Sequence, residues 1–219
     1  MFSYYGGKSK LVKYYPEAKY PLIIEPFAGS ARYALRFYDK NCWINDTYKV
    51  IYDVWHYIQK AKTDDLYKIP DLKKGDDLRD FNISPELRQL LGFAVNYSTP
   101  FPHNVYTTWA ARDGELMRFK KRLSKYIGKI DHWQITNWDY RFLPDCEATW
   151  FIDPPYQFGG KHYIENRINY KELSEWCKSR KGQVIVCENS KADWLPFVPL
   201  KEMQGQKHKT TEMIYTQES

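Results

Sequence analysis

The residues best suited to chemistry in this sequence are Asp153-Pro154-Pro155-Tyr156. Residues 149–152, which precede them, are β-branched, aromatic or aliphatic and predict a short buried strand. Two successive prolines lack backbone N–H donors and fix φ, so the strand must end there. The carboxylate, the proline carbonyls and the tyrosine ring are then presented at the carboxyl end of a strand, where open α/β sheets bind ligands.

These groups suit a flat ring that carries an amine. Asp153 and the carbonyl of Pro154 can accept hydrogen bonds from the amine, and Tyr156 can stack on the ring. An Asp-Pro-Pro sequence is also an ordinary turn, so the assignment of chemistry depends on the rest of the chain.

A strand–loop–helix unit typical of nucleotide-binding folds lies near the start of the chain. Residues 21–25 predict a compact buried strand, and residues 26–31 form a small-residue loop that contains Gly29. Residues 32–38 then predict a helix. Small residues in such a loop allow the backbone to approach a ligand at the helix N-terminus.

A second unit ends its strand in an acid. Residues 42–46 predict a strand that finishes at Asp46, and residues 47–61 predict a helix. Asp46 follows Gly29 at close to the roughly 20-residue spacing expected of an acid that binds ribose hydroxyls. Asp46 could equally cap the helix that follows it.

The remaining elements indicate an α/β fold. A helix is predicted at residues 170–181, and further strands at residues 132–136, 183–188, 198–203 and 212–216. Strands that alternate with helices and end in a hairpin indicate a mostly parallel sheet with an antiparallel edge. The polar loop at residues 157–169 contains Lys161 and His162, and its length beside the site is typical of a functional lid.

Residues 62–125 differ in character from what surrounds them. A helix begins at Ser84-Pro85, another begins at Gly114, and an irregular aromatic stretch that includes Trp109 lies between them. The second helix is rich in basic residues, including Lys120 and Arg122. We interpret this region as an inserted subdomain, within a catalytic domain made of residues 1–61 and 126–219. Bases and aromatics suit phosphates and unstacked nucleobases, although a merely solvated insert is an alternative.

Bulk composition limits which partners, metal sites and cellular compartments are expected. Lys and Arg number 33 against 27 Asp and Glu, a mild basic excess that permits nucleic acid as a partner without requiring it. The four cysteines form no C-x-x-C pair and the five histidines lack metal-ligand spacing, so we expect buried free thiols and no metal. Without a signal peptide or a membrane-length apolar run, we expect a soluble, cytoplasmic protein.

The order of the motifs resembles the D12-class, Dam-like DNA adenine-N6 methyltransferases, including short phage-type members. The segments that carry the resemblance are Tyr4-Tyr5-Gly6-Gly7-Lys8, Glu25-Pro26-Phe27-Ala28-Gly29-Ser30, Asn45-Asp46, Asn137-Trp138-Asp139-Tyr140 and Asp153-Pro154-Pro155-Tyr156. They cover about residues 1–60 and 130–190, and the insert matches only by its position, as the target-recognition region. Ala31 stands where the family often has a second glycine, and Tyr4 where tryptophan is common.

The resemblance implies the class I, Rossmann-like S-adenosylmethionine-dependent methyltransferase fold, a seven-stranded mixed sheet with its last strand inserted antiparallel. It implies methyl transfer from S-adenosylmethionine to the N6 amine of a flipped adenine in DNA. Asp153, Pro154, Pro155 and Tyr156 would be catalytic. The implied cofactor-binding residues are Tyr4, Gly6, Lys8, Glu25, Phe27, Gly29, Asp46, Asp139, Tyr140 and Asp153. Candidate DNA contacts are Lys120, Arg122, Lys161 and His162.

The sequence also permits other substrates and functions. The same tetrapeptide can serve cytosine N4, adenine in RNA or a protein glutamine amide. Asp rather than Asn at position 153, with this order of motifs, favours adenine in DNA. A non-catalytic nucleic-acid-binding protein of the same fold is an alternative from another class, and the presence of Asp46, Asp153 and Tyr156 argues against it.

Overall fold

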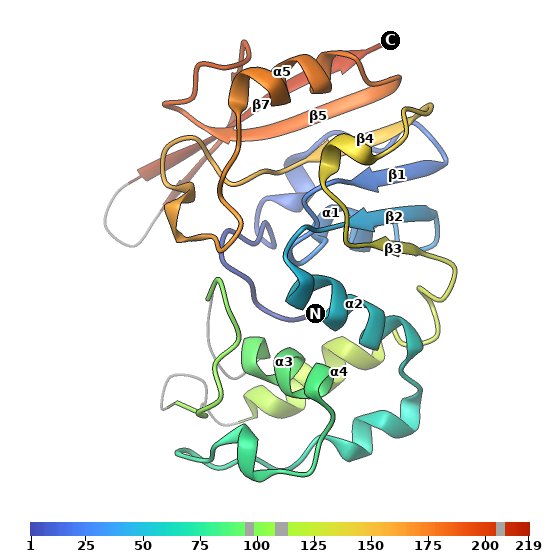
Figure 1. The fold of residues 1–219 in the computed structure, drawn as a ribbon, viewed down its shortest axis with the longest axis vertical. Helices are drawn as coiled ribbons and strands as arrows, with labels where there is room; N and C mark the ends of the chain where they lie inside the picture. Colours follow the sequence, from blue (N-terminus) through green and yellow to red (C-terminus); the bar gives the residue numbers. More distant parts are fainter. Residues whose placement is uncertain (95–98, 108–113, 205–208) are drawn as a thin grey trace.

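The computed structural model describes residues 1–94, 99–107, 114–204 and 209–219. Within these residues, seven strands form one mixed sheet (Figure 1). In chain order the strands are β1 (Leu22–Glu25), β2 (Asn41–Asn45), β3 (Gln134–Thr136), β4 (Ala148–Ile152), β5 (Gly182–Asn189), β6 (Val198–Gln204) and β7 (Lys209–Glu218). The α-helices are α1 (Arg32–Arg36), α2 (Lys49–Lys60), α3 (Pro85–Ala94), α4 (Glu115–Ser124) and α5 (Tyr170–Lys178).

The sheet has the order β3-β2-β1-β4-β5-β7-β6. The first five strands in this order pair in parallel, and β7 is antiparallel to both of its neighbours. The last strand is therefore inserted antiparallel between β5 and β6, which confirms the predicted class I methyltransferase fold. The order reverses direction between β1 and β4, the topological switch point at which such sheets bind ligands.

Alternating side chains of the central strands build two hydrophobic layers. Ile23, Phe151 and Ile185 face the layer that contains α1 and α2. Ile24 and Trp150, one residue away in each strand, face the opposite layer, which contains α5. This alternation follows from the two-residue period of a strand, and a strand buried on both faces reads as a continuous apolar run.

The helices α3 and α4 lie together at the end of the molecule opposite α5 (Figure 1). Their buried residues belong to the same hydrophobic cluster as Trp55 and Ile58 of α2, so α2 connects the sheet to this helical region. The Ser84 hydroxyl accepts a hydrogen bond from the Leu87 N–H at 3.2 Å, as expected of a cap at the start of α3. The division into a catalytic domain and an insert at residues 62–125 stays a prediction.

Two helices end earlier than the sequence predicts. The helix predicted at residues 32–38 ends at Arg36, because Phe37 leaves the helical region with φ −121° and ψ 40°. The helix predicted to reach residue 181 ends at Lys178. Trp109 lies outside the described residues, as do residues 205–208 of the expected hairpin. No helix of the described chain is both long and apolar enough to cross a membrane.

Candidate active site

One pocket gathers the predicted site at the carboxyl ends of β1, β2 and β4. Pro155 lines it, together with every residue that the resemblance assigns to the cofactor: Tyr4, Gly6, Lys8, Glu25, Phe27, Gly29, Asp46, Asp139, Tyr140 and Asp153. Pro154 and Tyr156 lie beside the pocket without lining it, and the four candidate DNA contacts do not line it either. The assignment of the lining residues to a cofactor stays a prediction.

The loop after β1 lines the pocket and packs closely against Tyr4. Gly29 has φ +46°, and a Cβ there would lie 3.0 Å from Cδ1 of Tyr4. Ala31 also adopts a left-handed conformation, with φ 42°, at the position where the resembling family often has glycine. The Trp55 indole N–H of α2 donates to the Gly29 carbonyl at 2.8 Å and so fixes the loop to α2.

Asp46 joins this loop to the start of α2. Its Oδ2 accepts the Gly29 N–H at 2.8 Å, and its Oδ1 accepts the Tyr48 N–H at 2.9 Å. The N-cap residue of α2 is Tyr48, so Asp46 braces the turn before the helix instead of capping it. Burial raises the pKa of Asp46 to about 6 against the opposing effect of both hydrogen bonds. Each carboxylate oxygen has a second lone pair available for a ligand.

Glu25 ends β1 as a buried acid, only 2% exposed. Its Oε1 accepts the Ala34 N–H of α1 at 2.5 Å. Burial raises the pKa of Glu25 from its ordinary value of 4.5 to about 8, although backbone hydrogen bonds oppose this shift. In the ligand-free protein Glu25 is therefore largely protonated at neutral pH.

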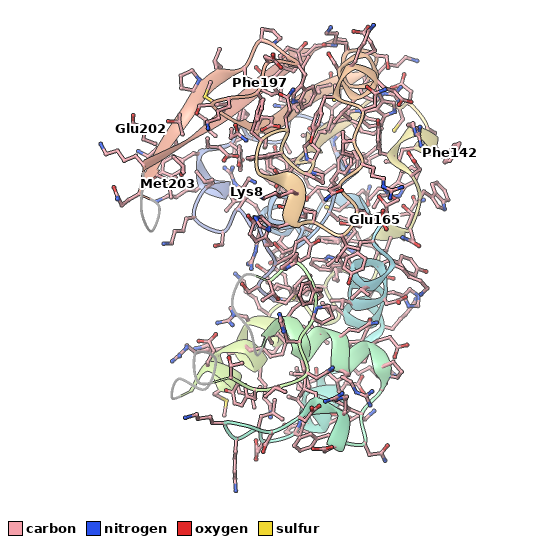
Figure 2. The ribbon with its side chains drawn as sticks, turned by 60° about the vertical axis from the view of Figure 1, so that its left-hand side comes forward. Lys8, Phe142, Glu165, Phe197, Glu202 and Met203 are labelled. Atoms are coloured by element: carbon pink, nitrogen blue, oxygen red, sulfur yellow. The ribbon has the colours of Figure 1, made fainter. Side chains whose placement is uncertain are left out.

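A buried ion pair joins the N-terminal motif to the tetrapeptide. Nζ of Lys8 lies 2.8 Å from Oδ1 of Asp153 and 4.0 Å from Oε1 of Glu212. Burial alone would lower the pKa of Lys8, but Asp153 and Glu212 raise it above its ordinary value. Lys8 is thus an ammonium ion inside the protein. It lies in the part of the molecule between the β6–β7 hairpin and the helices α3 and α4 (Figure 2).

The oxygen atoms at the end of β4 differ in their availability. Oδ1 of Asp153 is buried and forms an ion pair with Nζ of Lys8 without a well-aligned hydrogen bond, and the Tyr170 hydroxyl donates to the Pro155 carbonyl at 2.8 Å. Among the described residues, none donates a hydrogen bond to Oδ2 of Asp153 or to the Pro154 carbonyl. Oδ2 of Asp153 and the Pro154 carbonyl are the two groups predicted from the sequence to accept from an amine.

Tyr156 is fixed from two directions. Nζ of Lys8 lies 4.5 Å from the centroid of its ring, and the Tyr156 hydroxyl donates to Oε1 of Glu212 at 2.8 Å. Burial raises the pKa of the Tyr156 hydroxyl well above its ordinary value, so this group is a hydrogen-bond donor at neutral pH. Glu212 was missed by the sequence reasoning, although the strand period places this acid on the same buried face as Ile214.

The loop after the tetrapeptide closes over the N-terminal glycine turn. The Tyr163 hydroxyl donates to the Tyr5 carbonyl at 3.2 Å, and a Cβ at Gly6 would lie 2.0 Å from the Tyr163 oxygen. Glu188, at the end of β5, holds the beginning of the loop by accepting the Gln157 N–H at 2.5 Å. Sequence reasoning missed both Tyr163 and Glu188, because their partners are distant in the chain.

The candidate DNA contacts fall into two groups. Nζ of Lys120 donates to the Ile69 carbonyl at 3.0 Å, and Arg122 donates to Glu115 at 2.8 Å, so both bind within the helical region itself. Lys161 and His162 lie exposed on a short turn beside the pocket. No group of His, Cys, Asp and Glu in the described part of the chain is arranged to hold a metal ion.

A match to one family model agrees with the resemblance. Residues 4–86 match the model of the D12 class N6 adenine-specific DNA methyltransferases, which confirms the resemblance for this segment and supports a methyltransferase. No curated protein matches the chain. One similar solved structure is "Putative methyltransferase yhhF from Escherichia coli", which is 11% identical, with 97% of this chain and 80% of that chain covered and a TM-score of 0.36.

Proposed function

We propose that this protein transfers a methyl group from S-adenosylmethionine to the N6 amine of adenine in DNA. The observation that carries the proposal is the pair of available acceptors at the end of β4, Oδ2 of Asp153 and the Pro154 carbonyl. An amine has two hydrogens to donate, whereas a hydroxyl or a thiol has one. The match of residues 4–86 to a DNA adenine methyltransferase family supports the same class of acceptor.

The pocket beside these acceptors fits the cofactor. Gly29 lets the Tyr4 ring, which lines the pocket, pack closely on the loop after β1, and Asp46 keeps lone pairs that suit ribose hydroxyls. The rings of Phe27 and Tyr140, with centroids 5.2 Å apart, offer apolar contact to a nucleobase. When bound, S-adenosylmethionine supplies a methyl group that its sulfonium already activates.

The protein then has mainly to position the acceptor nitrogen. Hydrogen bonds from the amine to Asp153 and to the Pro154 carbonyl draw the nitrogen toward a tetrahedral geometry and make its lone pair available for attack. The adenine must first leave the DNA stack, which costs a few kcal/mol. Stacking on the face of Tyr156 that Lys8 does not cover would offset roughly 1–3 kcal/mol of this cost.

Tritium transfer from labelled S-adenosylmethionine to mixed-sequence DNA tests the proposal, with the product nucleosides separated. We expect label in N6-methyladenine. Asp153→Ala should lower turnover by at least about a hundredfold, since it removes one of the two acceptors, and should weaken cofactor binding only partly. Asp64→Ala, at an exposed acid of the helical region, is the matched control and should transfer normally.

Other products would replace the proposal with one of its alternatives. Label in N4-methylcytosine would identify a different base as the acceptor. The absence of label in DNA, with cofactor binding intact, would favour adenine in RNA, a protein glutamine amide, or a binding role without catalysis. Full turnover by Asp153→Ala would refute the role given to its carboxylate.

A further inference from the structure

Glu212 is a buried acid that the proposed mechanism leaves without a role. It lies on β7, paired in register with Asn189 of β5 and Lys201 of β6, and is 8% exposed. Burial raises its pKa above the ordinary value. A buried carboxyl group is costly unless it is well hydrogen-bonded, so its partners indicate what it does.

Those partners converge on one oxygen. Oε1 of Glu212 accepts the Tyr15 hydroxyl at 2.6 Å and the Tyr156 hydroxyl at 2.8 Å. Nζ of Lys8 is farther away, at 4.0 Å, and has its closer carboxylate partner in Asp153 at 2.8 Å. The stronger interactions of Glu212 are therefore with the two hydroxyls, because hydrogen bonds to an acid at these distances are short and well formed.

The Tyr156 ring needs such an anchor. Its backbone carbonyl is held by the Gly160 N–H at 2.9 Å, but χ1 and χ2 place the ring. The Lys8 ammonium 4.5 Å from the ring centroid restrains one face, and the hydrogen bond to Glu212 restrains the tip. Tyr15 holds Glu212 in turn and packs edge-on against Phe151, with ring centroids 4.9 Å apart, so the anchor is tied to the core of the sheet.

We propose that Glu212 is a positioning residue, which fixes the Tyr156 ring through its hydroxyl and so sets how the acceptor ring is presented to Asp153. This inference rests on the proposed function. It assigns the tyrosine hydroxyl a purpose separate from that of the ring face: the face contacts the acceptor, and the hydroxyl aims the face.

Enzyme kinetics with four variants test the proposal: Glu212→Ala, Glu212→Gln, Tyr156→Phe and the double variant Tyr156→Phe/Glu212→Ala. Glu212→Ala should lower kcat by about tenfold to a hundredfold and leave the KM for the cofactor within about threefold, as expected when a charged-group hydrogen bond that orients a reactant is lost. Glu212→Gln keeps an acceptor oxygen and should stay within about threefold of the wild type. The double variant should be no slower than Tyr156→Phe alone.

The matched control is Glu202→Gln on the neighbouring strand, which is exposed on the hairpin (Figure 2) and should behave as wild type. If Glu212→Ala does not fold, Tyr15→Phe/Glu212→Met removes the acid and the Tyr15 hydroxyl while apolar side chains fill their space. The Tyr156 hydroxyl then still lacks its acceptor, so this variant should show the same loss of kcat. A wild-type kcat in Glu212→Ala or in Tyr15→Phe/Glu212→Met would overturn the proposal. So would a Glu212→Gln variant as slow as Glu212→Ala, or additive losses in Tyr156→Phe/Glu212→Ala.

A measurement without substrate separates this inference from the proposed function. Protein labelled with 3-fluorotyrosine should show a fluorine resonance, assigned to Tyr156 by its absence in Tyr156→Phe, that reports a fixed ring in the wild type and an averaged ring in Glu212→Ala. An unchanged resonance would refute the anchoring role. If the anchor is present but the wild type methylates no DNA, the proposed function fails and the positioning of the ring stands.

Discussion

Glu25 gives the sharpest prediction about stability. Its pKa in the folded protein is about 8 and its ordinary value is 4.5, and burial is the cause. Between these values the folded protein holds a proton that the unfolded chain has released. The unfolded state therefore binds fewer protons in this window, so the free energy of unfolding must fall as the pH rises.

The magnitude follows from the two pKa values. From about pH 5 to pH 8, a carboxyl group with this shift removes about 3 kcal/mol of stability. Glu25→Gln resembles the protonated acid, keeps an oxygen to accept the Ala34 N–H, and has nothing to titrate. The free energy of unfolding of this variant should gain about 3 kcal/mol on that of the wild type across the same range.

The assay is urea unfolding without cofactor at several pH values, followed by tryptophan fluorescence. Only the difference between variant and wild type is interpreted, because Asp46, with a pKa of about 6, contributes to both. Glu202→Gln, at an exposed acid, should retain the wild-type dependence on pH. Parallel stability curves for Glu25→Gln and the wild type would refute the reasoning, since they would show that Glu25 is ionised in the folded protein.

Two further predictions concern the lid and the helical region. Gly6→Ala should destabilise the protein by about 1–2 kcal/mol, measured by urea unfolding, because φ at Gly6 is +72° and the new Cβ would strike Tyr163; wild-type stability would show that the lid is not held there. Lys121 and Lys125 lie exposed at the end of α4. Lys121→Ala/Lys125→Ala should reduce the slope of log DNA affinity against log salt by about 2, whereas Lys120→Ala should leave the slope unchanged, because Lys120 binds within its own region. Equal slopes for all three proteins would exclude this helix from the DNA interface.

How clearly the sequence predicts a strand depends on how deeply that strand is buried. Residues 149–152 are β-branched, aromatic or aliphatic because β4 is buried on both faces, and the two prolines end the strand. The apolar pattern that predicts the closing hairpin is weaker, because β6 is exposed along most of its length. The end of α1 could not be predicted, since the backbone turns at Phe37 without a glycine or proline to signal it.

The sequence predicted which residues gather at the site more fully than which atoms they contact. Asp153 and the Pro154 carbonyl follow from the tetrapeptide alone. That Lys8 takes one oxygen of Asp153 depends on contact between segments about 145 residues apart. Glu212 meets Tyr15 across 197 residues and Tyr156 across 56, so strand alternation could indicate a buried acid there but not what it binds.

Lys8 shows why a resemblance assigns a residue to a site more readily than to a role. Its motif implies a contact with the cofactor, and Lys8 does line the pocket. Its ammonium is nevertheless the charge that lies between the carboxyl groups of Asp153 and Glu212, and without it these two acids, one partly buried and one buried, would lack their shared counter-charge. Loss of activity in a Lys8 variant would therefore follow from rearrangement of Asp153 and Tyr156 even if the cofactor never touched the lysine. Under the proposed function, the same side chain would both order Asp153 and Tyr156 and contact the methyl donor, and so would couple the two halves of the pocket.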